Sequence, residues 1–295
     1  MNINVNTVSS TNFFDRKPII KKNETNENMD LSFRDNLLIS FGSTKNLKNI
    51  SLINHELLPQ NKIKAEKLTS LFENGTTKID YSYAEHLDDG RGITAGRAGF
   101  TTGTGDLYEV VKEYCKIKPK NPLKKYLPEL EKLASISSSN VNNLKGLIKD
   151  WHLASKDKVF RNTQDSVVDK MYYKPAMEHC KTLGLNLELS KAVFYDTIIQ
   201  HGDGNDLDSL NAIITNTNNR FGHSPKDVNE EKKWIKVFIE ERRKILANAN
   251  DPETRKVWSE SVGRCDAFID ILNQNNFNFD KSIKINTKEY NIEIN

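Results

Sequence analysis

Two acidic residues stand where a pair of carboxyl groups could cut a sugar polymer. Glu73 comes just before Asn74-Gly75, and Asp89 opens the glycine-rich segment 89–92, sixteen positions later. Hydrolysis of a glycosidic bond needs one protonated and one ionised carboxyl group on opposite sides of that bond. The end of a helix and the turn beyond it are suitable supports for such a pair. The spacing alone is also compatible with ordinary surface charges at both positions.

Three further charged residues lie among apolar residues at helical spacing. Asp196, Arg242 and Arg264 each share a helix face with large apolar residues, so we expect them to point inward. A buried charge is costly unless it is paired. One aspartate and two arginines leave one positive charge over, and the carboxylate of Glu73 would balance it. The alternative is that the arginine head groups reach the surface along their own aliphatic stems.

Asp106 and Thr94 each have a structural and a functional interpretation. Asp106, with Glu109 three residues later, forms a capping-box pattern, and the residues alone favour a helix cap. In a substrate cleft, the same carboxylate would bind the ammonium group of a sugar. Thr94 lies five residues after Asp89, where its hydroxyl could help to hold a water molecule.

The motifs disfavour other chemistry. Gly99–Gly105 lacks the lysine of a phosphate-binding loop, and His201–Asp206 lacks the closing glutamate of a calcium loop. The histidines have no metal-ligand spacing, so we expect no metal and no other cofactor. Cys115, Cys180 and Cys265 fit neither a zinc site nor a redox pair and are interpreted as isolated thiols, although one disulfide remains compatible with the sequence.

The elements around the candidate residues can be predicted from periodicity. An apolar helical face over 65–72 predicts a helix that ends at Asn74-Gly75, and alternation over Thr76–His86 predicts a strand. The glycines of 89–92 imply a tight turn, and Ile93–Ala95 could return as a second short strand.

The rest of the chain is predicted to be mainly helical. Apolar stripes at helical spacing recur along 107–114, 144–151, 192–199, 234–246 and 257–268. Alternation from Ile283 to Ile294 predicts a small terminal hairpin. We therefore expect a mainly α protein with a small β hairpin region (α+β).

Charge and hydrophobicity exclude several classes of protein. The 295 residues include 43 basic and 40 acidic ones, and a net charge of +3 gives little field for binding nucleic acid. No stretch approaches the ~20 apolar residues of a membrane-spanning helix. Residues 1–55 show no sustained period, so we expect a flexible polar tail before one folded domain at 56–295. The tail also lacks the apolar core of a secretory leader.

Several motifs, in this order along the chain, are similar to those of one enzyme family. They are Phe72-Glu73-Asn74-Gly75-Thr76-Thr77, Asp88-Asp89-Gly90-Arg91-Gly92 followed by Thr94, Gly99-Phe100-Thr101-Thr102-Gly103-Thr104-Gly105-Asp106, and Tyr195-Asp196-Thr197-Ile198-Ile199-Gln200-His201-Gly202-Asp203-Gly204. With these motifs the chain resembles glycoside hydrolase family 46, in particular its chitosanases of the Bacillus type. The resemblance runs from about residue 60 to the end and leaves only the tail uncovered.

The resemblance implies a fold and an activity. The fold would have two lobes in one folding unit, lysozyme-like, with a substrate cleft between them. The activity would be endo-hydrolysis of chitosan, a β-1,4-linked glucosamine polymer, with inversion at the anomeric carbon. The partner would be this polysaccharide and neither nucleic acid nor a membrane. We also expect a monomer that acts outside the cell.

The resemblance also implies roles for single residues. Glu73 would be the general acid and Asp89 the general base, with Thr94 positioning the attacking water. Arg91 and Asp106 would line the cleft and contact sugar. The remaining three charged residues would form a network behind the acid: Asp196, Arg242 and Arg264.

Two alternatives stay open. A lysozyme-like muramidase would share the layout of the two carboxylates. Two clusters of acidic residues suit a cationic polymer better than peptidoglycan: Glu85, Asp88, Asp89 and Asp106, and Asp203, Asp206 and Asp208. A catalytically inactive carbohydrate-binding effector would keep the fold without the reaction.

Overall fold

The computed structural model describes residues 56–87 and 90–295, and the predicted tail at 1–55 lies outside these ranges. Helices make up most of the described chain: α1 Pro59–Asn74, α2 Asp106–Ile117, α3 Leu127–Ser135, α4 Leu147–Ala154, α5 Lys158–Val168, α6 Lys174–Thr182, α7 Glu188–His201, α8 Leu210–Phe221, α9 Val228–Ala247, α10 Pro252–Trp258 and α11 Gly263–Asn273. Three short helical segments join them: η1 Lys124–Tyr126, η2 Asp169–Tyr173 and η3 Ser259–Ser261. The strands are β1 Ala84–His86, β2 Ile93–Ala95, β3 Phe100–Thr101, β4 Ile283–Asn286 and β5 Asn291–Ile294. The prediction of a mainly α protein with a small β region is confirmed.

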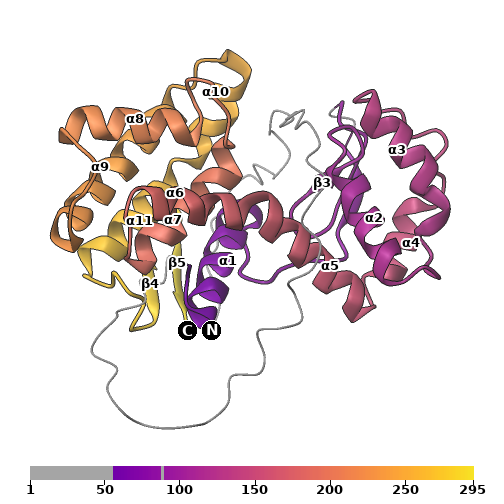
Figure 1. Cartoon of the computed structure of the whole chain (residues 1–295), viewed down its shortest axis with the longest axis horizontal. Coiled ribbons are helices and arrows are strands. Elements are labelled where there is room, and N and C mark those ends of the chain that lie inside the picture. The colour runs from indigo at the N-terminus through magenta and orange to yellow at the C-terminus, as the bar shows by residue number, and fades with distance from the viewer. Residues whose placement is uncertain (1–55, 88–89) are drawn as a thin grey trace, which may run out of the picture.

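The elements form two lobes (Figure 1). The smaller lobe, on the right of the figure, contains the sheet β1–β3 and helices α2 to α4, and β1 packs against α4. The larger lobe contains α1, α6 to α11 and the β4–β5 hairpin, and α1 packs against α7. The helix α5 crosses from one lobe toward the other. Buried apolar residues of both lobes belong to one continuous core.

The link between the lobes is a long helix that widens in the middle. Residues 158–182 are helical throughout, but 169–173 form a π-helical turn in which Lys174 N donates to Asp169 O. Pro175 explains the change: it has no N–H for the carbonyl of Met171, and its ring would collide with that carbonyl in an α-helix. A π-helical turn before the proline removes the conflict.

The helix α1 ends where the sequence predicts. Gly75 adopts φ 66°, and its N–H donates to Leu71 O over 2.9 Å. This left-handed position favours glycine, which has no Cβ. The opposite face of the last turn is anchored by Leu71 and Phe72, which are buried. The side chain of Glu73 therefore projects from a rigid helix end.

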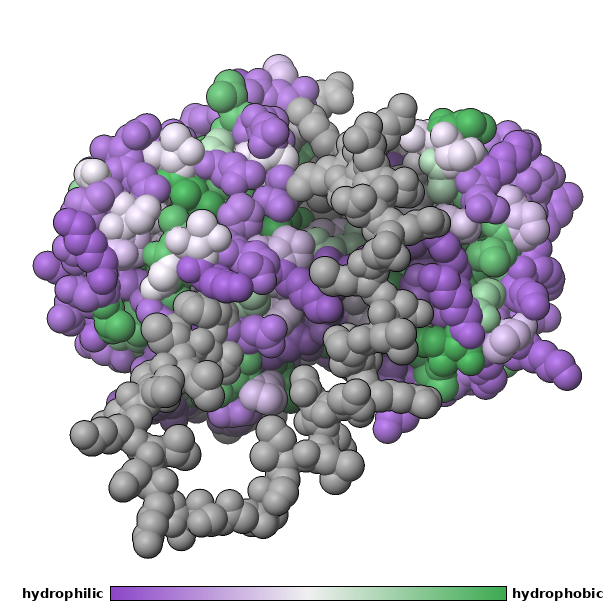
Figure 2. All heavy atoms as spheres, viewed as in Figure 1, coloured by the Kyte–Doolittle hydropathy of each residue, from purple (hydrophilic) through white to green (hydrophobic). Residues whose placement is uncertain are grey.

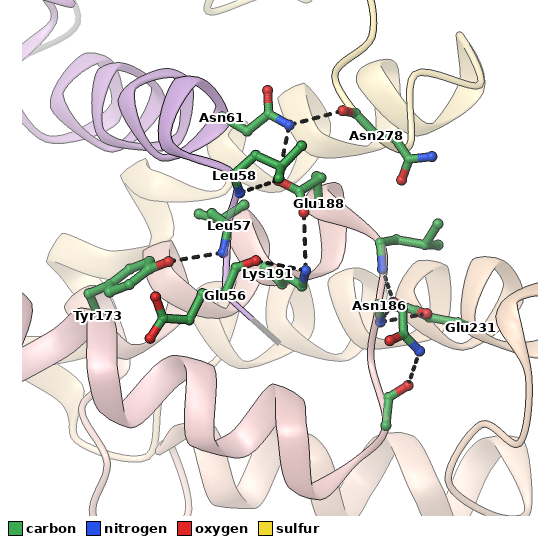
Figure 3. Close-up of polar contacts among 12 residues, drawn as sticks. Glu56, Leu57, Leu58, Asn61, Tyr173, Asn186, Glu188, Lys191, Glu231 and Asn278 are labelled. Atoms are coloured by element: carbon green, nitrogen blue, oxygen red, sulfur yellow. Dashed lines mark hydrogen bonds and ion pairs between the residues drawn. The ribbon is translucent and has the colours of Figure 1, made fainter. Parts of the chain in front are cut away.

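The start of α1 is held by α7 (Figure 3). The N-cap residue Leu58 offers no side-chain cap, but Glu188 Oε2 accepts hydrogen bonds from Leu58 N and Asn61 Nδ2, each over 2.9 Å. Lys191 Nζ donates to Glu188 Oε1 and to Glu56 O, each over 3.0 Å. A carboxylate at a helix N-terminus is favoured by the helix dipole. The buried pair thus fixes α1 on α7.

The predicted strand over Thr76–His86 is wrong except for its last three residues. Local side chains bind the backbone instead: Asp80 Oδ1 accepts hydrogen bonds from Ser82 N and Ser82 Oγ, and Thr76 Oγ1 accepts one from Lys78 N. Such turns compete with a strand ladder. Only Ala84–His86 pairs, and it does so with Ile93–Ala95 in antiparallel register.

The other strand predictions hold. Ile93–Ala95 is a buried strand, and the chain ends in the predicted hairpin, with Ile283 opposite Ile294 and Ile285 opposite Ile292. All three cysteines are free; Cys180 and Cys265 are buried, and Cys115 is half-buried. On the face in Figure 2, apolar residues are scattered among hydrophilic ones over both lobes.

Candidate active site

Glu73 lies in a buried, charged environment at the end of α1. Its side chain is 4% exposed, and Oε1 accepts a hydrogen bond of 2.9 Å from Arg264 Nη2 on α11. The Arg264 guanidinium also lies over the ring of Phe72, 5.7 Å from its centroid. The neighbouring Tyr290 has its pKa raised to about 12, mainly by burial. The carboxyl group is therefore held in one place and shielded from bulk water.

Asp196, Arg242 and Arg264 lie together behind Glu73. Asp196 Oδ2 is 2.7 Å from Arg242 Nη1 and 3.5 Å from Arg264 Nη1, and both carboxylates contact Arg264. Burial alone would lower the pKa of Arg264, but Asp196 and Glu73 raise it above its ordinary value. The two carboxylates and two guanidinium groups balance in charge, which a dry interior requires. The structure thus brings together the three charged residues that the sequence places on inward faces and Glu73, the carboxylate expected to balance them.

Charge holds this network more than aligned hydrogen bonds do. Among the described residues, both Asp196 oxygens and all three Arg242 guanidinium nitrogens lack a hydrogen-bond partner of good geometry. Asp196 and Arg242 therefore form a close ion pair whose atoms are not aligned as in a hydrogen bond. Such a pair depends on both partners, because removing either one leaves an uncompensated buried charge.

Asp89, the candidate base, lies outside the described residues, together with Asp88. The chain around this gap is described on both sides. β1 ends at His86 before it, and Arg91 follows it, with Arg91 O accepting a hydrogen bond of 2.9 Å from Gly103 N. Gly92 adopts φ 80°, and a Cβ there would lie 2.1 Å from Thr102 Oγ1. The segment after residue 89 is thus tightly fitted against the 102–103 turn.

Thr94 is completely buried in β2, paired with Glu85 on one side and Thr101 on the other. Its hydroxyl has no hydrogen-bond partner among the described residues. A buried hydroxyl usually has a partner, and one that lacks it is suited to binding a water molecule.

Asp106 is not the helix cap that the capping-box pattern predicts. Gly105, at φ 85°, is the N-cap of α2, and Asp106 is the first helical residue. Asp106 Oδ1 instead accepts hydrogen bonds from Thr101 N, Thr104 Oγ1 and Leu107 N, over 2.7, 2.6 and 2.9 Å. The left-handed glycine starts the helix one residue earlier than a side-chain cap would. The carboxylate ties β3 to the start of α2.

The described residues contain no group of three or more His, Cys, Asp or Glu side chains that could hold a metal ion. The fully buried His201 is engaged in packing: its Nδ1 lies 2.8 Å from Asp208 O, and its ring meets Trp258 edge-on.

Arg97, which is not among the candidate site residues named from the sequence, lies between the lobes. Arg97 contacts Glu66 on α1 and Asp165 on α5, and its side chain is 5% exposed. One signal could have found it: Arg97 is the only charged residue in the run from Gly92 to Gly105.

Comparison with known proteins gives first the class and then the family. Over 229 residues, 78% of this chain and 83% of the relative, the chain is 52% identical to a chitosanase of Bacillus subtilis strain 168. The protein is therefore a glycoside hydrolase. Residues 67–283 match the model of glycosyl hydrolase family 46, and the chain belongs to this family.

Solved structures agree with the fold. The Gynuella sunshinyii GH46 chitosanase in complex with chitotetraose is 41% identical with a TM-score of 0.73, over 81% of this chain and 99% of that one. A mutant chitosanase of Bacillus subtilis MY002, complexed with 6 GlcN, is 50% identical with a TM-score of 0.73, over 81% and 100%. The expected two-lobed, lysozyme-like fold is confirmed.

No helix in the described part of the chain has both the length and the apolar character needed to cross a bilayer.

Proposed function

We propose that this glycoside hydrolase is a chitosanase that cleaves β-1,4 linkages inside partly acetylated chitosan, with inversion at the anomeric carbon. The observation that carries the proposal is the buried Glu73 at the end of α1, held by Arg264 in a balanced charge network. The names of the relatives agree with this substrate, since two of them were solved with chitotetraose and with 6 GlcN.

Glu73 acts as the general acid in this proposal. The protonated carboxyl group donates its proton to the leaving glycosidic oxygen, while the C1–O bond breaks and charge develops on the sugar ring. Asp89 acts as the general base on the other face. It takes a proton from the water that forms the new bond to C1, and the Thr94 hydroxyl orients this water. Within the described part of the chain this hydroxyl is buried and has no hydrogen-bond partner, which supports its role.

Arg91 and Asp106 contact the sugar in this proposal. The acidic residues of the cleft attract the ammonium groups of glucosamine, which gives a preference for deacetylated polymer over chitin. We further propose that the enzyme works as a monomer and without a cofactor. It would act outside the cell, because a polysaccharide substrate is found there.

The test follows the early products of glucosamine hexamer by anomer-resolved NMR. Inversion predicts that the new reducing ends appear first as the α-anomer. Glu73→Gln and Asp89→Asn are each expected to retain less than about 1% of the activity, since general acid–base catalysis contributes ~10²–10⁴-fold. The thermal unfolding midpoint of Asp89→Asn should stay close to that of the parent chain. A β-anomer product, or substantial activity in either variant, refutes the assignment.

Two comparisons separate the alternatives. A muramidase would clear a suspension of bacterial cell walls faster than it lowers the viscosity of chitosan. An inactive carbohydrate-binding effector would bind glucosamine hexamer without releasing any shorter product.

A further inference from the structure

Arg97 follows the strand that carries Thr94 and contacts two helices at once. Its Nη2 lies 3.4 Å from Glu66 Oε1 on α1, and its Nη1 donates to Asp165 Oδ1 on α5. Burial alone would lower the pKa of the guanidinium, but Glu66 and the other nearby acidic groups raise it above its ordinary value. Arg97 is thus a charged, buried link between β2, α1 and α5.

The backbone around Arg97 is fixed to the same linking helix. Arg97 N donates to Gln164 Oε1 over 3.0 Å, and Gly96 N donates to Tyr83 O over 2.7 Å. Gly96 adopts φ 75°, and a Cβ there would lie 2.5 Å from Gln164 Oε1. The turn after Thr94 therefore cannot shift without breaking contacts to α5.

Glu66, the partner of Arg97 on α1, lies on the same helix as the candidate acid Glu73. Glu66 precedes Glu73 by seven residues on α1. Two helical turns separate them, roughly 10 Å along one side of the helix. Through Arg97, the strand of the smaller lobe is connected to the helix of the larger lobe that ends at Glu73.

A pocket lies beside this link. Glu66 and Arg97 form part of its wall, together with Thr69 and Ser70 of α1 and Tyr195 of α7. The hydroxyls of Thr69 and Ser70 are buried and have no hydrogen-bond partner among the described residues. The space beside the contacts of Arg97 is therefore not completely filled by packed side chains.

We propose, resting on the function proposed above, that Arg97 is a positioning residue. It sets the spacing between the lobes, and so the spacing between Glu73 at the end of α1 and Thr94 on β2. A shift of about 1 Å between reacting groups can slow a reaction ~100-fold. Loss of the contacts of Arg97 should therefore lower kcat more than it weakens substrate binding.

Kinetics on glucosamine hexamer test this role. Glu66→Gln removes the α1 end of the link while Asp165 still holds Arg97, and Arg97→Met removes both ends. We expect kcat to fall about tenfold in each, with KM changed less than about twofold. Arg97→Lys keeps the charge and should recover part of the loss. The double variant should be no worse than Arg97→Met alone, because both changes act on one contact.

A matched control lies one turn earlier on α1. Lys62 pairs with Asp169 over 2.7 Å and approaches Glu66 within 3.7 Å, without contacting Arg97. Lys62→Met should keep kcat, although it removes two ion pairs of the same helix. All rates are measured at least about 15 °C below the unfolding midpoint of the weakest variant. Unchanged kcat in Glu66→Gln and Arg97→Met, or additive losses in the double variant, overturns the proposal.

A distance measurement separates this proposal from the proposed function. Spin labels on half-buried Cys115 of α2 and on an introduced cysteine at exposed Lys236 of α9 report the spacing of the lobes. Double electron–electron resonance should give a broader distribution of the distance between the two labels in Arg97→Met than in the parent chain or in Lys62→Met. If the parent fails to cut the hexamer but the distribution broadens, the proposed function fails and the positional role stands. An unchanged distribution overturns the role of Arg97 whatever the activity.

Discussion

Arg264 donates a hydrogen bond to the carboxylate of Glu73 from a position 191 residues later in the chain. Both side chains are buried, at 2% and 4% exposure. The pair joins the last turn of α1 to α11 and places a permanent positive charge against the candidate acid. The position of the candidate catalytic residue thus depends on a contact between segments that are far apart in the sequence.

Arg264→Met should impair both stability and activity. It removes the Arg264 guanidinium from Glu73 and from Asp196, and breaking a buried pair costs about 3–5 kcal/mol of unfolding free energy. We expect kcat to fall by about 100-fold, because the acid loses the group that holds it. Urea unfolding and hexamer hydrolysis measure the two effects. Arg243→Met removes the exposed Arg243–Asp266 pair and should cost less than about 1 kcal/mol; an equal cost in both variants would contradict the argument.

Stability should fall below neutral pH because of His201. Burial, and after it the nearby positive charge of Arg242, holds the pKa of this histidine well below its ordinary value of 6.5. The folded state therefore keeps His201 neutral while the unfolded chain takes up a proton below about pH 6.5. The unfolded state then binds more protons, so stability is lost as the pH falls.

The comparison with His201→Gln isolates this effect. The difference in unfolding free energy between the parent chain and the variant should be constant above about pH 7. Below pH 6.5 it should shrink by up to about 1.4 kcal/mol per pH unit, the value of one proton. Urea unfolding between pH 5 and pH 8 measures it, and a difference that stays constant across this range refutes the role of His201.

The sequence predicts features that depend on local residues. Gly75 ends α1 because its backbone must be left-handed, and Asp196 and Arg264 stand out as charges on apolar helical stripes. The pairing of Arg264 with Glu73 could only be expected from charge balance and from the resemblance, since no periodicity connects residues 191 positions apart.

Other features could not be predicted because competing local contacts decide them. Ile79 and Tyr81 alternate as in a strand, but the Asp80 side chain turns the backbone there. Asp106 looks like a cap, but Gly105 takes that position. The proposed role of Arg97 depends on contacts with Glu66 and Asp165, which belong to two other elements of the fold.

Gly92→Ala should destabilise the chain more than replacement of a left-handed glycine that has open space around it. At φ 80° a side chain is strained, and its Cβ would lie 2.1 Å from Thr102 Oγ1 and 3.1 Å from Ser139 O. Backbone strain and overpacking together should cost about 3 kcal/mol. Gly184 is the matched control: it adopts φ 70°, but no atom lies within 4 Å of its Cβ position. Gly184→Ala should cost about 1 kcal/mol; equal shifts in thermal unfolding would show that the contact with Thr102 is unimportant.

The Glu188–Lys191 pair at the start of α1 should show strong coupling (Figure 3). Glu188→Gln removes the Glu188 carboxylate that pairs with the Lys191 ammonium, 2% exposed, which should cost about 3–5 kcal/mol. Lys191→Met should cost less, because Glu188 keeps the donors Leu58 N and Asn61 Nδ2. The double variant leaves no unpaired charge, so it should be more stable than Glu188→Gln alone. Urea unfolding of the four chains gives the coupling energy, and simple additivity of the two single effects would mean that the pair contributes no ion-pair stabilisation.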